Sequence, residues 1–257
     1  MLLTERQIKR WNERGWLKCD YLLTDLTIAR LPLWVDELST RTQSVKEKRL
    51  HYYEQTDTGP VLCRTERFLE DITSVQRLIC CAEIIGAADE LLGEPATLLK
   101  EKINYKQPGG AGFSAHQDAV AYSFAKRHLT CVIAIDDMTV ENGCLEFARD
   151  HANDILPINN DGCIDQEVAQ TLSWEPVEMP RGAVTIFGSL MPHRSSSNQS
   201  DKPRRAMFLT YNPLSEGIFR EQYYASREAS LESQQSQGHS AISTIRHFQG
   251  QSAGGAR

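Results

Sequence analysis

The sequence predicts a mainly β fold with flanking helices, in the form of a barrel or a double-sheet jelly roll. The chain has 257 residues, which is enough for one domain with a sizeable buried core. Between residues 96 and 213 it divides into short apolar, strand-like runs separated by Pro, Gly, Asn and Asp. Helical periodicity is instead concentrated before residue 93. We therefore expect two sheets or a closed barrel with helices packed outside.

A short helix followed by a strand is expected at the N-terminus. Thr4 is a suitable N-cap, and Ile8, Trp11 and Trp16 have helical spacing. Gly15 lies where such a helix would stop.

Two longer helices are expected over residues 25–48 and 72–93. The apolar residues of the second segment share one broad face; they are Val75, Leu78, Ile79, Ala82, Ile85, Ala88 and Leu92. The adjacent Cys80 and Cys81 lie within this segment, so we expect them in the core.

The expected strands follow in close succession. They are residues 96–106, 129–137, 143–148, 177–180, 182–188 and 205–212. Together with the helices they form one predicted domain over residues 1–230. Residues 231–257 are rich in Ser, Gln and Gly and are expected to be a polar, mobile tail.

Composition excludes several classes of protein. The net charge of −6 and the absence of a basic cluster argue against a nucleic-acid partner. No apolar run approaches the roughly 20 residues that span a bilayer, and the charged N-terminus does not resemble a signal peptide, so a cytoplasmic protein without a membrane partner is expected. The seven cysteines lack C-x-x-C spacing and are expected to be reduced thiols. The sequence does not indicate an oligomeric state.

His116 and Asp118 form the first candidate metal site. If both lie on one strand they point to the same side, whereas Gln117 points away. His193 follows another apolar strand and is the best third ligand. Two histidines and one carboxylate leave coordination positions open, an arrangement associated with non-haem Fe(II) oxygenases. An isolated H-x-D is common by chance, so the hypothesis depends on the company of His193 and of a nearby arginine.

Arg204 is that arginine. It lies 11 residues after His193, across a turn-rich segment, so the two are expected on adjacent antiparallel strands with both side chains facing inward. An inward arginine requires an anionic partner, and the segment offers no obvious acidic residue. A ligand carboxylate would suit it. Because neighbouring strand residues face opposite ways, Arg205 is expected to point outward.

Four segments together resemble the phytanoyl-CoA dioxygenase superfamily of Fe(II)/2-oxoglutarate oxygenases. They are HQD, AIDDMTVENGCLEF, PHRSSSN and PRRAMFLTYN, and the resemblance covers roughly residues 5–225. It implies a double-stranded β-helix, which is a cupin-like jelly roll, and an enzyme that uses Fe(II), 2-oxoglutarate and O2. It also implies that His116, Asp118 and His193 bind iron and that Arg204 anchors the distal carboxylate of 2-oxoglutarate.

The same resemblance implies further contacts with 2-oxoglutarate. Ser195 matches a position that adds a hydroxyl to the distal carboxylate, and Asn104 matches a co-substrate contact of the related ectoine hydroxylases. Thr130 and Lys102 are weaker candidates for the same pocket. Many family members have a Pro-Gly-Ser-His turn where this chain has ARDH, and we interpret His151 there as a turn residue and not as a ligand.

The substrate is expected to be a small molecule. Two segments, 101–118 and 209–227, look most like the branch that holds the 2-aminoethylphosphonate dioxygenases, so a small zwitterion such as 2-aminoethylphosphonate is the working hypothesis. Tyr52 and Tyr122 would surround its ammonium and Arg64 would pair with its anion. Alternatively, Arg64 pairs with a nearby glutamate and Tyr122 is ordinary strand packing.

Three other functions remain open. The same chemistry could act on a natural-product intermediate, which would have little need of Arg64. A non-catalytic cupin-like binding module would be expected to have lost a ligand or the arginine. A zinc hydrolase would lack a reason for the inward arginine, and the sequence has no H-E-x-x-H motif.

Overall fold

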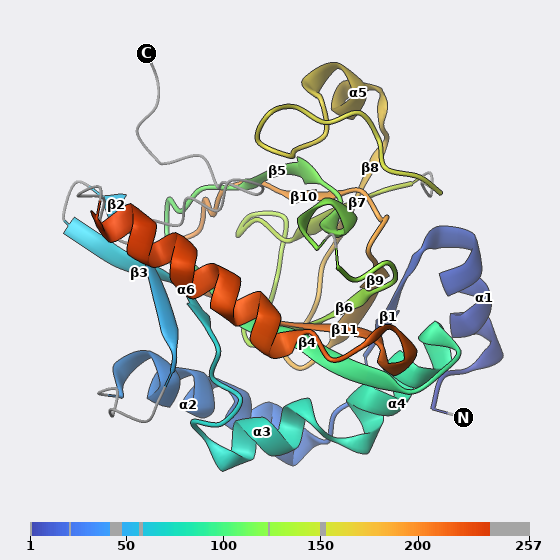
Figure 1. The fold of residues 1–257 in the computed structure, drawn as a ribbon, viewed down its shortest axis with the longest axis horizontal. Coiled ribbons are helices and arrows are strands. Elements are labelled where there is room, and N and C mark those ends of the chain that lie inside the picture. The colour runs from blue at the N-terminus through green and yellow to red at the C-terminus, as the bar shows by residue number, and fades with distance from the viewer. Residues whose placement is uncertain are drawn as a thin grey trace.

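Two antiparallel β-sheets face each other in the computed structural model (Figure 1). The structure describes residues 2–20, 22–41, 48–56, 59–122, 124–149 and 153–236. The larger sheet contains, in spatial order, β1 (Trp16–Cys19), β9 (Val184–Gly188), β6 (Leu129–Ala134), β11 (Arg204–Pro213), β4 (Ala96–Lys106), β3 (Gly59–Glu66) and β2 (Leu50–Thr56). The smaller contains β5 (Phe113–His116), β10 (His193–Ser195), β7 (Leu145–Ala148) and β8 (Trp174–Val177). The predicted mainly β, double-sheet architecture is confirmed.

Strand β6, an inner strand of the larger sheet, is buried on both faces, and this explains why its sequence is continuously apolar. Leu129, Cys131 and Ile133 belong to the cluster shared with the helices. Val132 and Ala134 belong to the cluster between the two sheets. A strand covered on both sides needs apolar residues at successive positions and not only at alternate ones. The helices thus cover one face of this strand, and the other face borders the space between the two sheets.

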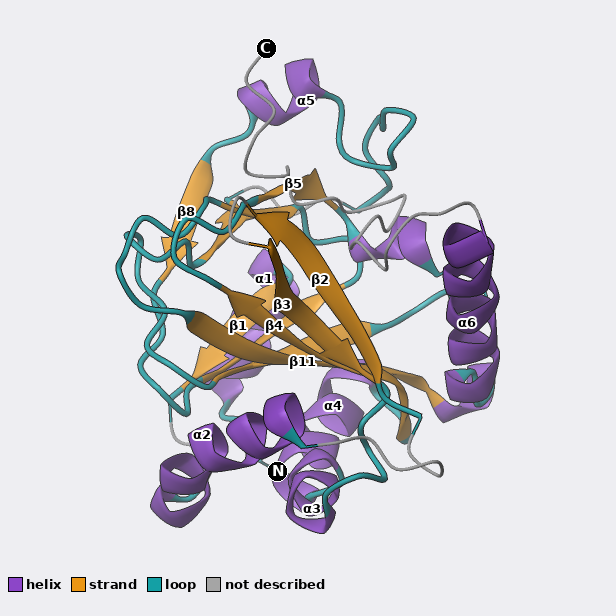
Figure 2. Cartoon of the chain, turned by 90° about the vertical axis from the view of Figure 1, so that its left-hand side faces the viewer, coloured by secondary structure: helices purple, strands orange, loops and turns teal. Residues whose placement is uncertain are grey.

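Three helices cover the outer face of the larger sheet (Figure 2). They are α2 (Asp25–Thr40), α3 (Thr73–Ile79) and α4 (Ala82–Leu92). The predicted helix 25–48 therefore ends at Thr40, and residues 42–47 lie outside the described ranges.

The predicted single helix over 72–93 is wrong, because the chain breaks between α3 and α4. Cys80 ends α3, and Cys81 is the extended N-cap of α4. Both cysteines were expected in the core, but Cys80 is exposed and Cys81 is only partly buried. The break lets each helix place its own apolar side against the sheet.

The N-terminal helix α1 (Glu5–Arg14) matches its sequence signals. Thr4 and Gln7 form a reciprocal capping box, and Gly15 adopts a left-handed conformation with φ of 70°. Strand β1 follows directly and pairs with β9.

The C-terminal helix α6 (Arg220–Ser236) was not expected. Tyr223 and Tyr224 are buried in a small cluster with Leu99, Tyr122 and Ala125, which fixes the helix against the end of the sheets. The helix continues to Ser236, six residues past the predicted domain boundary at residue 230. The rest of the predicted tail, residues 237–257, lies outside the described chain.

Short helices complete the fold. They are α5 (Gln166–Thr171) and the 3-10 turns η1 (Asp118–Ala121) and η2 (Leu214–Glu216). Among the helices that the structure describes, none combines the length and apolar character needed to cross a membrane.

Candidate metal centre

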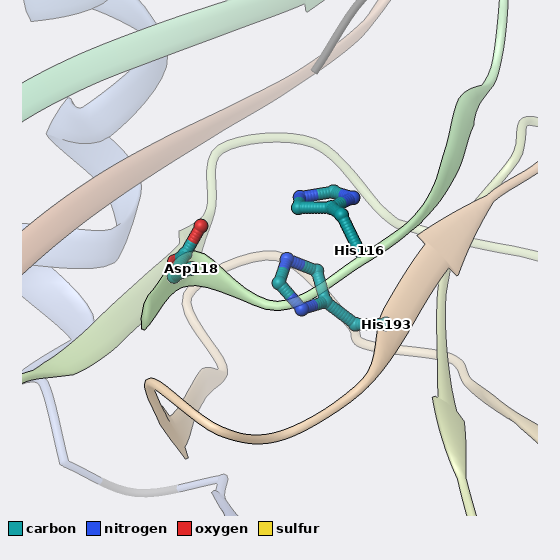
Figure 3. A group of neighbouring side chains, drawn as sticks. All are labelled: His116, Asp118 and His193. Carbon is teal, nitrogen blue, oxygen red and sulfur yellow. The ribbon is translucent and has the colours of Figure 1, made fainter. Parts of the chain in front are cut away.

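Three side chains from two strands and a turn converge between the sheets (Figure 3). His116 is the last residue of β5 and pairs in register with His193, the first residue of β10. Asp118 begins η1. All three are buried, and their candidate ligand atoms all lie within 4.8 Å of one another. The structure thus brings together the three predicted metal ligands.

The local path of the chain at Asp118 differs from the prediction. The strand ends at His116 and the chain turns into η1, so Asp118 does not lie on the same strand as His116. Gln117 points away as expected: its amide nitrogen donates to the carbonyls of Asp154 at 3.0 Å and Leu190 at 2.6 Å, and its oxygen accepts from Leu156 N–H. These bonds hold the turn that aims Asp118 at the histidines.

Backbone carbonyls fix the tautomers of both imidazoles. Nδ1 of His116 lies 2.7 Å from the Ser114 carbonyl, and Nδ1 of His193 lies 3.0 Å from the Met191 carbonyl. Because a carbonyl can only accept, each Nδ1 carries the proton and each Nε2 keeps a lone pair. Such carbonyl contacts typically orient metal-binding histidines.

Burial and neighbouring charges favour the protonation states that a metal requires. Burial lowers the pKa of His193, and lowers that of His116 well below the ordinary value, so both imidazoles are neutral. Burial opposes ionisation of Asp118, but nearby positive charge holds the pKa of its carboxyl below the ordinary value; this charge is that of His193 when protonated, and those of Lys100 and Lys102. A carboxylate with two neutral imidazoles is the donor set that suits Fe(II) with open positions.

Thr130 supports Asp118 and does not line the pocket beside it. Its hydroxyl donates to Asp118 Oδ2 at 3.2 Å and also contacts the Thr210 hydroxyl at 3.1 Å. The structure thus places this predicted co-substrate contact behind the metal ligand.

A pocket between the sheets joins the metal ligands to most of the other predicted site residues. Its lining comprises Lys102, Asn104, Phe113, His116, Asp118, Leu145, Phe187, His193, Arg194, Ser195, Arg204 and Phe208. Lys102, Asn104, Ser195 and Arg204 therefore share one space with the histidines, as expected. Three phenylalanines and Leu145 supply apolar walls that the sequence analysis did not identify.

Arg204 is a buried cation that faces this pocket. Its side chain donates to the Gly143 carbonyl at 2.7 Å, and its Nε–H has no partner in the described structure. No carboxylate of the described residues pairs with it, and burial lowers its pKa to about 10. Arg205 faces the opposite way and binds Asp136 at 2.8 Å. The predicted orientation of the two arginines is confirmed.

The sequence predicted that His193 and Arg204 lie on adjacent strands, and this prediction is wrong. Strand β10 belongs to the smaller sheet and β11 to the larger, so the two residues approach the pocket from opposite sheets. The connecting segment crosses between the sheets and is held by Asn198, which donates to the carbonyls of Lys106 at 3.0 Å and Lys202 at 2.8 Å.

Lys106 is a site residue that the sequence analysis missed. Its ammonium donates to Ser195 Oγ at 2.8 Å, to the Gly143 carbonyl at 3.2 Å and to the Ser196 carbonyl. Burial, and then the nearby Arg204, lower its pKa to about 6. The signal was present in the strand KEKINYK, where alternate residues share one face.

The three predicted substrate contacts lie outside this pocket lining. The Tyr122 hydroxyl accepts a short hydrogen bond from Lys100 Nζ, and its ring packs edge-on against Tyr223. Arg64 donates to Asn104 Oδ1 at 3.3 Å and lies 3.5 Å from Glu66 Oε1. Its guanidinium also stacks over the ring of Tyr52, 5.6 Å from the centroid.

The alternative in which Arg64 pairs with a glutamate therefore describes its geometry, although the pair is buried and not on the surface. His151 lies outside the described residues.

The chain is similar over most of its length to one protein family and to several known proteins. The model of the phytanoyl-CoA dioxygenase (PhyH) family matches residues 11–206. A methylphosphonate hydroxylase of Gimesia maris is 44% identical, over 98% of this chain and 97% of that protein. A 2-aminoethylphosphonate dioxygenase of an uncultured bacterium, HF130_AEPn_1, is 38% identical over 86% of each chain. The crystal structure of EctD from S. alaskensis with 2-oxoglutarate and 5-hydroxyectoine has a TM-score of 0.70 at 18% identity and covers 84% of this chain and 78% of EctD.

Proposed function

The chain belongs to the phytanoyl-CoA dioxygenase family, and on that premise we propose that it hydroxylates a small alkylphosphonate with Fe(II), 2-oxoglutarate and O2. The chain is an oxygenase of the Fe(II)/2-oxoglutarate class, as its relatives named hydroxylase and dioxygenase are. The observation that carries the proposal is one pocket that holds the His-Asp-His group and an unpaired, buried Arg204.

His116, Asp118 and His193 would hold Fe(II). Bound iron and 2-oxoglutarate together supply the oxidative decarboxylation to succinate and CO2 that is coupled to hydroxylation of a C–H bond. The residues present fit this metal, because both Nε2 atoms are unprotonated and Asp118 is ionised. Thr130 holds one oxygen of Asp118 and so limits the orientation of the carboxylate.

Arg204 and Ser195 would bind the distal carboxylate of 2-oxoglutarate. The Nε–H of Arg204 has no partner among the described residues and could donate to that carboxylate, and the Ser195 hydroxyl lines the same pocket. Lys106 holds Ser195 in place. Asn104, on the inner face of β4, would add an amide contact along the co-substrate.

The lining also bears on the substrate. An organic ammonium requires a carboxylate or an aromatic cage, and the only carboxylate among the lining residues is Asp118, which is committed to the metal. Tyr52 and Tyr122, expected to form such a cage, are engaged elsewhere. The three phenylalanines of the lining already face other side chains: Phe113 faces Lys106, Phe187 faces His193 and Phe208 faces Lys102. These observations favour a phosphonate without an amine over the zwitterion expected from sequence. Methylphosphonate is therefore the better candidate, and 2-aminoethylphosphonate the second.

The other functions have less support. A non-catalytic module would not be expected to keep three ligands, oriented tautomers and a buried arginine in one pocket. A neutral natural-product scaffold would leave the cations of Lys102 and Arg204 in the pocket with only the co-substrate to neutralise them.

The test is anaerobic loading with Fe(II), addition of 2-oxoglutarate and a phosphonate, and exposure to O2. We expect succinate and a hydroxylated phosphonate in equal amounts, measured by chromatography and 31P NMR, with methylphosphonate used faster than 2-aminoethylphosphonate. The Asp118→Ala protein should bind less iron and form neither product, since a buried ligand is lost. Succinate without any hydroxylated phosphonate would show that the substrate class is wrong.

A further inference from the structure

We propose that Lys102 binds the anionic group of the substrate at the metal end of the pocket. The proposal rests on the proposed phosphonate substrate and adds the residue that recognises it. It assigns Lys102 to the substrate and not to 2-oxoglutarate, the ligand implied by the sequence resemblance.

The position of Lys102 follows from the register of the larger sheet. It lies on β4, directly between Phe208 of β11 and Glu66 of β3. Its side chain lines the pocket together with His116 and Asp118. The ammonium lies 4.8 Å from the centroid of the Phe208 ring. Lys102 therefore extends from the larger sheet into the pocket that contains the metal ligands.

Lys102 differs from the other two lysines on the same face of β4. Lys100 is bonded to the Tyr122 hydroxyl, and Lys106 donates to Ser195, Gly143 and Ser196. No hydrogen bond or ion pair joins the ammonium of Lys102 to any residue that the structure describes. The ammonium lies over the Phe208 ring, and burial, then Lys100 and Arg64, lower its pKa well below the ordinary value, although Asp118 and Glu66 oppose this. A buried amine without hydrogen-bond acceptors is poorly satisfied inside a protein. An anion in the pocket would supply the missing acceptors.

The distal carboxylate of 2-oxoglutarate is not that anion. Arg204 pairs in register with Lys106, four residues along β4 from Lys102. A strand rises about 3.3 Å per residue, so the backbone positions from which the two side chains start are separated by roughly 13 Å along the sheet. Arg204 and Lys102 thus start from opposite ends of the pocket, and Lys102 is placed to bind a second anionic group beside the metal ligands. A phosphonate provides acceptor oxygens for a lysine that acts as a point charge.

Arg64, the residue first expected to bind the substrate anion, has a different role in this geometry. Its Nε–H donates to Asn104 Oδ1, so the Asn104 amide directs its N–H donors away from Arg64. Arg64 also faces Glu66, which neutralises it. It is a positioning residue for Asn104, whereas Lys102 has no hydrogen bond or ion pair with the residues that the structure describes and can bind a ligand.

The experiment compares Lys102→Met and Lys102→Arg with the wild-type protein. Methylphosphonate binding is measured by isothermal titration calorimetry on protein loaded with Mn(II) and 2-oxoglutarate, and KM values for both substrates are measured with Fe(II). Loss of a charged hydrogen bond is worth about 1.5–3 kcal/mol, so Lys102→Met should weaken methylphosphonate binding on the order of 10- to 100-fold. The KM for 2-oxoglutarate should stay within about threefold, and Lys102→Arg should retain most of the affinity.

The exposed Lys202→Met serves as the matched control for loss of a lysine charge and should match wild type in both measurements. Thermal unfolding of each variant, followed by circular dichroism, checks that the fold is kept, and Lys102→Arg keeps the test usable if the methionine variant is unstable.

The outcomes separate this proposal from the function on which it rests. If wild type binds methylphosphonate and Lys102→Met binds it equally well, Lys102 is not the anchor, although the proposed function stands. If Lys102→Met instead raises the KM for 2-oxoglutarate and leaves methylphosphonate binding intact, the residue belongs to the co-substrate. If wild type neither binds nor hydroxylates any phosphonate, the proposed function fails, and this proposal fails with it.

Discussion

Arg204 and Arg205 are neighbours in the chain but occupy opposite environments. Arg204 is 2% exposed and faces the pocket, whereas Arg205 forms an ion pair with Asp136 and contacts Asp36 on the other face of β11. The alternation of a strand produces this difference, since adjacent side chains project to opposite faces. At the residue scale, a one-residue shift of register would exchange their roles.

We expect Arg204→Ala to raise the KM for 2-oxoglutarate on the order of 100-fold, because truncating one partner of a buried charge pair costs about 2–5 kcal/mol or more. Arg205→Ala is the matched control. It should leave that KM nearly unchanged and lower the unfolding free energy by about 1 kcal/mol at most, as for other ion pairs near the surface. Steady-state kinetics and urea unfolding measure the two effects. A higher KM in Arg205→Ala alone would mean that the register is wrong.

At the scale of elements, the site depends on how closely β7 and β10 approach the end of β4. Gly143, just before β7, has φ of 71° and lies against the segment that follows β10. A Cβ on this residue would lie 2.2 Å from the Ser196 carbonyl oxygen and 2.9 Å from Lys106 Nζ. Its own carbonyl accepts from Arg204 and Lys106. Only glycine allows this approach, which holds the side chains of Arg204 and Lys106 at the distal end of the pocket.

Gly143→Ala should therefore lower the unfolding free energy by about 3 kcal/mol and raise the KM for 2-oxoglutarate, because backbone strain and a steric clash act together. Gly109→Ala is the control: its φ is 73°, but nothing lies within 4 Å of an added Cβ. In that variant the unfolding free energy should fall by only about 1–2 kcal/mol, which is the cost of a left-handed backbone conformation for a residue with a Cβ. Urea denaturation checks both values. Equal losses in the two variants would indicate that the contact with Ser196 does not matter.

At the scale of the whole molecule, the buried histidines connect the site to folding stability. His116, His128 and His193 are all buried, and burial lowers their pKa values, that of His128 to about 4. In the unfolded chain each would titrate near 6.5. Between these values the unfolded state binds more protons than the folded state, so stability falls as the pH decreases below about 6.5.

The metal-free protein should accordingly lose stability between pH 6.5 and 5, approaching about 1.4 kcal/mol per pH unit for each histidine that stays neutral. Urea unfolding at several pH values measures this slope. His128→Leu removes one of the groups without removing a metal ligand, and its slope should be smaller than that of wild type. A stability that is constant over this range would contradict the neutral, buried state of these imidazoles. Iron binding should weaken over the same range, because protons compete with the metal for Nε2.

The sequence determined those features that depend on neighbouring residues. Spacing and capping identified α1, from Thr4 to Gly15, and strand alternation separated Arg204 from Arg205. The H-x-D pair with a distant histidine identified the group that could hold a metal, because metal binding requires particular side chains whatever the route by which the chain brings them together.

Only the tertiary structure decided which surfaces meet. The break at Cys80 and Cys81 has no Gly or Pro to signal it, and it arises where two short helices pack on the sheet. The placement of β10 and β11 in opposite sheets, like the partners of Arg64, depends on strand pairing between residues far apart in the chain. Propensity and periodicity report only local preference, whereas burial and counter-ions are set by long-range packing. For this reason the sequence could identify Lys102 as a pocket residue, but only the structure distinguished it from the satisfied Lys100 and Lys106.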